Sequence, residues 1–246
     1  MTQKANTYHI PVLRDACIQG LNIQAQGIYV DVTFGGGGHS KAIYKNLNEK
    51  GFLYGLDQDA DAKENIWSAS NFEFIQSNFS FLTNQLRARK VNTVDGILAD
   101  LGVSSHQFDV PERGFSTRGM ADLDMRMNKT GSTTAADVIN QYDENDLIGI
   151  LRKYGEIKNA RKLASEIVQK RLNAPIQTTQ DFIELLSKMA PKFKEHKYYA
   201  QVFQALRIEV NRELEVLESF LVQASKLLNP GGRLVVISYH SLEDRI

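Results

Sequence analysis

The chain has 246 residues, of which 42% are hydrophobic and 24% are charged, and its formal net charge is zero. This composition is ordinary for a globular protein, and the balanced charge excludes a globally basic, histone-like mode of nucleic-acid binding. Cys17 is the only cysteine, which excludes disulfide frameworks and cysteine zinc sites within one chain, and we expect no metal site.

No apolar run approaches the roughly 20 residues that cross a bilayer. The first residues, Met1 to Tyr8, are polar and contain no apolar signal core. We therefore expect a cytoplasmic protein without a membrane partner. The sequence leaves the oligomeric state open, and a homo-oligomer is compatible with it.

Strand-like and helix-like segments alternate over the first hundred residues. Strands are predicted at 28–32, 52–56, 72–76 and 94–98. Helices are predicted at 40–47, 60–70 and 80–89, the last with Phe81, Leu82 and Leu86 on one side. Such alternation predicts a parallel sheet with helices on both faces, and the ligands of such sheets bind at the carboxyl ends of the strands.

The pattern changes after Asp100. Residues 102–131 form a long loop-like region, and a loop of this length is usually functional or disordered. Apolar spacing then predicts helices at 144–154, 157–172, 181–190, 199–208 and 213–228, with a capping box opening the third, and a fifth buried strand at 233–239. We therefore expect a helical insertion at 106–196, flanked by residues 1–105 and 197–246, which together form one α/β domain.

Four glycines, Gly35 to Gly38, follow the first predicted strand. Without a Cβ they let the backbone turn tightly and approach a ligand closely, and the turn would present N–H groups at the start of a helix. Asp57 ends the second strand, nineteen residues past Gly38. A carboxylate in that position can hold a pair of ribose hydroxyls, so the sequence predicts a nucleoside cofactor.

The glycine turn alone fits either a dinucleotide for hydride transfer or S-adenosylmethionine for methyl transfer. Asp31 favours the second, because a carboxylate so close to the turn would repel a pyrophosphate and attract a sulfonium ligand that carries an amino group. The pattern Asp31-x-x-x-Gly35-x-Gly37 resembles the first motif of Rossmann-like S-adenosylmethionine methyltransferases. A nucleotide-dependent oxidoreductase on a Rossmann-like fold stays as an alternative hypothesis.

Longer blocks of sequence are more specific than the glycine turn. They lie at 95–109, 112–116, 123–127, 203–211 and 238–245. In this order they are similar to the bacterial small-subunit ribosomal RNA cytosine-N4 methyltransferase H family, also called MraW, over nearly the whole chain. The resemblance implies an α/β, Rossmann-like class I S-adenosylmethionine methyltransferase with an inserted all-helical domain. It also implies N4-methylation of a cytidine in the decoding region of 16S rRNA, presented on the small ribosomal subunit.

The resemblance further implies which residues contact S-adenosylmethionine: Gly37, Gly38, His39, Asp57, Phe79, Asp100 and Gln107. Physical reasoning gives the methionine portion to the Gly37–Gly38 backbone, the ribose hydroxyls to Asp57 and the adenine face to Phe79. Phe79 could instead be an ordinary core residue, and His39 could instead cap the start of the helix.

Catalysis is expected from Asp100, Tyr239 and His240. Cytosine N4 is a poor nucleophile because its lone pair is delocalised into the ring, and Asp100 can accept a hydrogen bond from its N–H. The Pro-Pro-aromatic element that follows this carboxylate in many amine-directed methyltransferases is absent, so Tyr239 or Phe115 is expected to stack on the base, which must leave its own stack. His240 has either a structural or an active-site role.

Arg113, Phe115, Arg118 and Arg126 in the long loop are the candidates for RNA contacts. Four lysines could extend that surface, although a solvated charged face is the interpretation we favour for them: Lys188, Lys192, Lys194 and Lys197. Family members continue beyond Ile246. A third hypothesis is therefore a truncated form that binds the cofactor and turns over weakly, with its fifth strand as an exposed edge.

Overall fold

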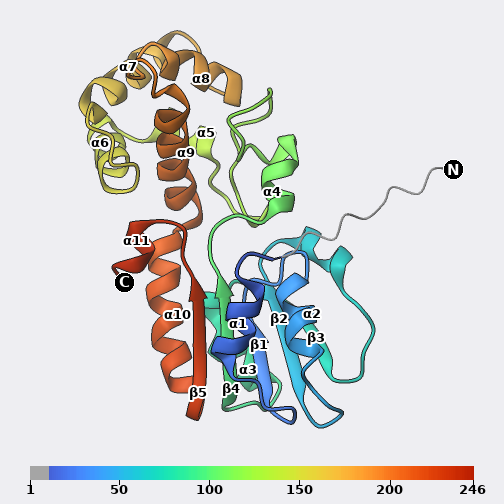
Figure 1. Cartoon of the computed structure of the whole chain (residues 1–246). Helices are drawn as coiled ribbons and strands as arrows, with labels where there is room; N and C mark the ends of the chain where they lie inside the picture. The colour runs from blue at the N-terminus through green and yellow to red at the C-terminus, as the bar shows by residue number, and fades with distance from the viewer. Residues whose placement is uncertain (1–10) are drawn as a thin grey trace, which may run out of the picture. The chain divides into compact units, whose positions relative to one another are not determined.

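The computed structural model describes residues 11–246, so the polar segment Met1 to Tyr8 lies outside the described residues. The chain divides into two compact units. The first contains the described residues up to Gly102 together with Val216–Asp244, and the second contains Val103–Glu215 and Arg245–Ile246. Figure 1 labels the helices and strands of both units.

The first unit is built on a five-stranded parallel sheet in the order β3-β2-β1-β4-β5. Its strands are β1 (Ile28–Asp31), β2 (Phe52–Asp57), β3 (Phe72–Gln76), β4 (Val94–Asp100) and β5 (Leu228–Ile237). The four strands predicted in the first hundred residues are confirmed, as is the α/β class.

Helices cover both faces of this sheet, as predicted. On one face α1 (Arg14–Leu21) and α2 (Gly38–Tyr44) pack their apolar side chains with Tyr29 of β1. On the other face α3 (Leu82–Ala88) and the part of α10 (Glu213–Leu227) within this unit pack with Val30. Adjacent residues of β1 enter opposite cores because successive strand side chains point to opposite faces.

Two predicted details of this unit are wrong. The segment 60–70 contains only a 3₁₀ helix, Ala60–Asn65, after which Trp67 stacks on Phe72 with ring centroids 3.9 Å apart. This aromatic contact holds the chain extended where local spacing favoured a helix. Phe81 is exposed while Leu82 and Leu86 are buried, because Phe81 closes a 3₁₀ turn (Phe79–Phe81) and the α-helix begins after it.

The fifth strand also differs from its prediction. It begins at Leu228, includes the Pro230-Gly231 segment and is mostly half-buried or exposed, with only Ile237 buried. The reason is its position: among the described residues β5 pairs with β4 alone and lies at the edge of the sheet. A four-residue helix, α11 (Ser241–Asp244), follows it.

The second unit is helical. It contains α4 (Ser105–Asp109), a 3₁₀ turn (Pro111–Arg113), α5 (Ala135–Gln141), α6 (Glu144–Lys153), α7 (Ala160–Asn173), α8 (Thr179–Ser187) and α9 (Glu195–Asn211). Their apolar faces form one core, to which Leu163, Phe182 and Phe203 contribute. The predicted capping box is present, with Thr178 accepting from the N–H of Asp181.

The second unit ends later than the insertion expected at 106–196. The reason is α9, whose buried side chains Tyr198, Val202 and Leu206 belong to the helical core. Of the helices within residues 11–246, none is both long enough and apolar enough to cross a membrane.

Candidate functional site

Three aspartates end three adjacent strands of the sheet. Asp57 ends β2, Asp31 ends β1 and Asp100 ends β4. Parallel strands bring their carboxyl ends to one edge, which is where ligands of such sheets bind. The candidate site of the first unit is therefore this strand-end cluster, together with the glycine turn that follows β1.

The glycine turn has a conformation that demands glycine at two positions. Gly37 has φ +73°, in the left-handed region that side chains disfavour, and its N–H donates to the carbonyl of Phe34 at 2.7 Å. At Gly38 an added Cβ would lie 2.4 Å from Cγ of Pro11. Gly37 is buried and its N–H is already used, whereas Gly36 is exposed with open space where a Cβ would lie and Gly38 is half-buried. The backbone that a ligand can approach is therefore that of Gly36 and Gly38.

Asp57 is tied to this turn by both of its carboxylate oxygens. Oδ2 accepts from the N–H of Gly35 at 2.7 Å, and Oδ1 accepts from the N–H of Asp59 at 2.8 Å. Burial raises the pKa of Asp57 to about 6, although both backbone hydrogen bonds lower it. The side chain is only half-buried. It is therefore a partly accessible hydrogen-bond acceptor beside the glycines.

Asp31 has a different environment from the one that its sequence position suggested. It is fully buried, and its carboxylate accepts from the Ser40 hydroxyl at 2.7 Å and from the Thr33 N–H at 3.1 Å. Burial raises its pKa. Asp31 therefore makes no direct contact with a ligand in this conformation, and its electrostatic attraction of a sulfonium ligand stays a prediction. Asp31 instead joins the end of β1 to the start of α2.

Asp100 brings together His39 and Tyr239. Its Oδ1 accepts from the Tyr239 hydroxyl at 2.8 Å, and its Oδ2 lies 3.5 Å from Nε2 of His39. The Asp100 N–H donates to Oγ1 of Thr33 at 2.7 Å, which fixes the end of β4 beside β1. His39 is 5% exposed, and within residues 11–246 neither of its ring nitrogens finds a hydrogen-bond partner. Buried polar atoms in this state need an explanation.

Tyr239 presents an accessible aromatic ring beside Asp100. The residue is 54% exposed, and its N–H donates to Oε2 of Glu243 at 2.8 Å. Burial of the hydroxyl and the nearby Asp100 carboxylate raise the pKa of Tyr239 well above its ordinary value. The hydroxyl therefore stays protonated and remains a donor to Asp100.

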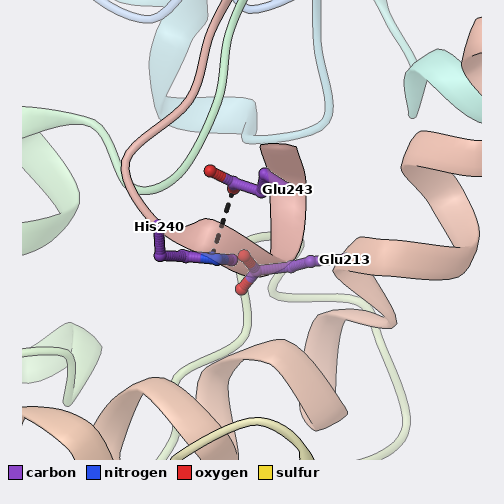
Figure 2. A group of neighbouring side chains, drawn as sticks. All are labelled: Glu213, His240 and Glu243. Carbon is purple, nitrogen blue, oxygen red and sulfur yellow. Dashed lines mark ion pairs between the residues drawn. The ribbon is translucent and has the colours of Figure 1, made fainter. Parts of the chain in front are cut away.

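His240 is held by Glu243 in the turn that follows β5. Figure 2 shows the two side chains, with Nε2 of His240 3.3 Å from Oε1 of Glu243. Glu243 thereby contacts both His240 and the backbone of Tyr239. This arrangement favours the structural interpretation of His240, which stabilises the turn that presents Tyr239.

Phe79 and Gln107 both make structural contacts. Phe79 is half-buried and packs edge-to-face on Phe220, with ring centroids 5.1 Å apart. Gln107 is buried in the helical unit, where its Oε1 accepts from the Ser104 N–H at 3.1 Å and completes a capping box of α4. For both residues the cofactor role stays a prediction.

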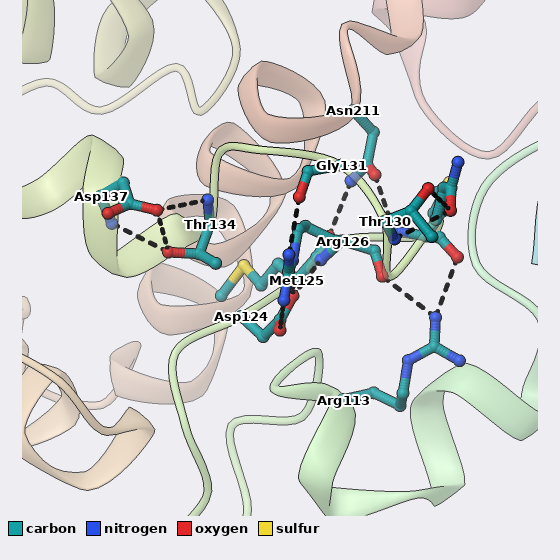
Figure 3. A network of polar contacts seen from close by, with 11 residues as sticks. Arg113, Asp124, Met125, Arg126, Thr130, Gly131, Thr134, Asp137 and Asn211 are labelled. Carbon is teal, nitrogen blue, oxygen red and sulfur yellow. Dashed lines mark hydrogen bonds and ion pairs between the residues drawn. The ribbon is translucent and has the colours of Figure 1, made fainter.

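Two of the four predicted RNA contacts, Arg113 and Arg126, have side chains that hydrogen-bond within the loop of the second unit (Figure 3). Arg113 is 4% exposed, and its Nη2 donates to the carbonyls of Arg126 and Met127, each at 3.0 Å. Arg126 donates to both oxygens of Asp124, at 2.8 and 2.7 Å. Asn211 of α9 accepts from the N–H of Met127 at 2.8 Å.

These contacts correct the expected RNA surface. Arg113 and Phe115 are only 4% and 6% exposed, and the guanidinium of Arg126 is occupied by Asp124 and the Gly131 carbonyl. Arg118 is exposed and stays a prediction. Of the two candidates for stacking on the base, Tyr239 has an accessible ring and Phe115 is buried, so Tyr239 is the one that we propose.

Sequence reasoning missed Thr33, Ser40 and Glu243, which position Asp100, Asp31 and Tyr239. No motif distinguishes such residues, because their roles follow from tertiary contacts. Of the three, only Glu243 lies in a sequence block that resembles the family, residues 238–245, and this is the only feature of the sequence that could have indicated its role.

Comparison with known proteins gives the family. A sequence model described as the MraW methylase family matches residues 6–246. The protein named "Ribosomal RNA small subunit methyltransferase H" from Cytophaga hutchinsonii is 56% identical over 241 residues, which are 97% of this chain and 80% of that protein.

Two further relatives carry the same name. The protein from Phocaeicola vulgatus is 56% identical over 246 residues, or 100% of this chain and 81% of that protein. The protein from Flavobacterium johnsoniae is 53% identical over 239 residues, or 97% of this chain and 79% of that protein. Similarity at this level along the whole matched length is decisive: the chain belongs to the MraW methylase family.

Proposed function

We propose that this chain transfers a methyl group from S-adenosylmethionine to N4 of a cytidine in the decoding region of 16S rRNA, on the small ribosomal subunit. The relatives named as methyltransferases of small-subunit ribosomal RNA support the reaction and the class of substrate. The observation that carries the proposal is the convergence of the glycine turn, Asp57 and Asp100 at one edge of the sheet in a member of a methylase family.

The strand-end cluster fits S-adenosylmethionine in three respects. Asp57 offers a half-buried carboxylate suited to a ribose diol. The glycine turn exposes backbone at Gly36, where no other atom lies within 4 Å of an added Cβ, and leaves Gly38 half-buried. His39 has buried ring nitrogens that lack hydrogen bonds within residues 11–246, so a ligand would satisfy them. These residues, with Phe79 and Asp100, would hold the cofactor, which supplies an electrophilic methyl group when bound.

Asp100 and Tyr239 would act on the cytosine. The Asp100 carboxylate would accept a hydrogen bond from the N4 amino group, which helps the nitrogen to localise its lone pair, and it would take the proton that the amine loses. The Tyr239 hydroxyl holds Asp100 in place at 2.8 Å. Its exposed ring would stack on the extruded base, and positioning of this kind is a large part of the catalysis of a displacement reaction.

The alternatives carry less support. A nucleotide-dependent oxidoreductase is not favoured by a match to a methylase family or by relatives named as methyltransferases. A form that only binds the cofactor is not favoured either, and the assay below tests it. A ribosomal substrate agrees with the cytoplasmic location that we expect from the sequence.

The test is a transfer assay with isotopically labelled S-adenosylmethionine and small subunits that lack the modification, followed by mass spectrometry of the nucleosides. We expect labelled N4-methylcytidine from the native chain and at least about a hundredfold less from Asp100→Asn. Cofactor binding without product would support the weakly active form. Absence of cofactor binding would exclude the proposed function.

A further inference from the structure

The segment 188–197 is a strongly basic surface of the helical unit. It comprises the connection between α8 and α9 and the first turn of α9, and it contains Lys188, Lys192, Lys194 and Lys197 with a single glutamate, in a chain whose net charge is zero. All four lysines are exposed. Among residues 11–246 none of these ammonium groups has an ion-pair partner. The segment therefore carries an uncompensated positive charge.

Phe193 lies in the middle of this segment and is 95% exposed, more than any other large hydrophobic side chain in the described part of the chain. Its φ is +64°, the left-handed region that a bulky residue rarely adopts. A solvated charged face needs neither an aromatic ring in water nor this backbone conformation. The lysines alone fit the solvated interpretation, and Phe193 does not.

Asn159, the residue before α7, is hydrogen-bonded near the start of the segment and to the residue that follows its end. Its Nδ2 donates to the carbonyl of Met189 at 3.2 Å, and its Oδ1 accepts from the hydroxyl of Tyr198 at 3.0 Å. The Phe193 N–H donates to Oε1 of Glu195 at 3.1 Å. The ring is thus displayed from a loop that is anchored on both sides, which lowers the entropy cost when a partner binds it.

We propose that Phe193 stacks on an unpaired base of RNA while Lys192 and Lys194 contact the adjacent phosphates. The inference rests on the proposed function, which supplies an RNA substrate. Aromatic side chains flanked by cations are the usual means of binding single-stranded RNA, because every base has a π-face and every linkage carries a negative charge. Phe193 then binds the substrate RNA and takes no part in the chemistry at Asp100.

The first experiment measures the affinity of a labelled single-stranded RNA oligonucleotide by fluorescence anisotropy. Phe193→Ala should bind about fivefold to a hundredfold more weakly than the native chain, while Phe193→Trp should bind like it. The matched control is Leu172→Ala, which removes an exposed apolar side chain (74% exposed) next to Arg171 on α7 of the same unit. We expect Leu172→Ala to bind RNA like the native chain. We expect the affinity for the cofactor to be unchanged in Phe193→Ala, Phe193→Trp and Leu172→Ala.

Two further readouts separate stacking from general attraction. A 2-aminopurine base in the oligonucleotide should be quenched by the native chain and by Phe193→Trp, and not by Phe193→Ala. Replacing Lys192 and Lys194 with Gln should lower the slope of log affinity against log salt by about 0.7 for each phosphate that a lysine no longer neutralises, while the quenching at saturating protein remains.

Equal RNA affinity of Phe193→Ala and the native chain would overturn the inference, as would native affinity in Phe193→Leu, because leucine cannot stack on a base. The transfer assay is run in parallel on the same preparations. Product formation by the native chain, together with unchanged RNA affinity of Phe193→Ala, rejects only the role of Phe193. Failure of the native chain to bind the cofactor rejects the proposed function itself.

Discussion

Functional roles were predicted both for the strand-end cluster of the first unit and for the 113–131 loop of the second. The side chains of the two regions differ in how much of their polar surface is accessible. At the strand ends Asp57, Asp100 and Tyr239 are positioned by neighbours and keep accessible polar or aromatic surface. In the loop Arg113 and Arg126 donate to carbonyls and carboxylates of the same loop. Charged residues of the long loop thus serve the conformation of the loop itself, whereas Asp57 and Asp100 accept hydrogen bonds from neighbours and still keep accessible surface.

The largest expected effect concerns the chemical role of the strand-end cluster. Asp100→Ala should lower the rate of methyl transfer by at least about a hundredfold, because the acceptor for the N4 proton is removed. Single-turnover transfer to small subunits measures this rate. Glu49→Ala, an exposed change in the same unit, should leave the rate unchanged. Equal rates for Asp100→Ala and the native chain would remove Asp100 from the mechanism.

The next effect tests the structural role of the loop. Arg113→Ala should lower the free energy of unfolding by about 3 kcal/mol, because two buried carbonyls lose a charged donor. Urea denaturation monitored by circular dichroism measures it. For Arg118→Ala we expect a change within about 0.5 kcal/mol. A stable Arg113→Ala variant with weakened RNA affinity would instead show that Arg113 reaches RNA.

A smaller effect is the pH dependence of cofactor affinity. The pKa of Asp57 is raised to about 6 by burial, and ribose hydroxyls donate best to the ionised carboxylate. Affinity should therefore be constant above pH 7 and fall as the pH drops through 6, by up to about tenfold per unit. Asp57→Asn should bind weakly, with this dependence removed. Calorimetric titration between pH 5 and 8 gives the profile, and an unchanged profile in Asp57→Asn would assign the titration to another group.

The same raised pKa has a consequence for folding. Because the folded chain holds the Asp57 proton more tightly than the unfolded chain does, this group stabilises the fold below its ordinary pKa, and that contribution disappears as the pH rises through about 6. Asp57→Asn should therefore be destabilised less by a rise from pH 5 to pH 7 than the native chain is. If the melting temperature changes equally between pH 5 and pH 7 in Asp57→Asn and in the native chain, the raised pKa does not belong to Asp57.

The smallest effect separates the two parts of Tyr239. Tyr239→Phe keeps the exposed ring and removes one hydrogen bond to Asp100, so transfer should slow by about fivefold, corresponding to about 1 kcal/mol. Tyr239→Ala removes the ring as well and should slow transfer further. Initial rates at saturating substrate compare the two variants. If both variants slow transfer equally, the ring does not stack on the base.

Much of the first unit could be predicted from the sequence, because buried runs of apolar residues, a glycine turn and strand-terminal carboxylates are local signals. Strands β1 to β4 and the positions of Asp57 and Asp100 followed from them. The prediction of a helix over 60–70 was wrong because Trp67 packs on Phe72. A contact between separate segments cannot be predicted from the local pattern of apolar residues. Helix α1 was not predicted, and its weakly amphipathic sequence explains why.

Burial of polar residues was the information that the sequence lacked. Arginine and aspartate are usually exposed, so Arg113 was assigned to RNA and Asp31 to a ligand. Arg113 is buried because Arg126 and Met127 need a donor for their carbonyls, and Asp31 is buried because Ser40 and Thr33 satisfy its carboxylate. Only the folded chain shows where the donors and acceptors meet.

The measurement that tests the proposed cofactor site most directly is the affinity of S-adenosylmethionine for Asp57→Ala at pH 8, by calorimetry. The control is Glu49→Ala, which removes an exposed carboxylate of the same unit. We predict that Asp57→Ala binds about a hundredfold more weakly than the native chain, because two charge-assisted hydrogen bonds are removed, and that Glu49→Ala binds normally. Native affinity in Asp57→Ala would contradict the assignment of the cofactor site to the ends of the strands.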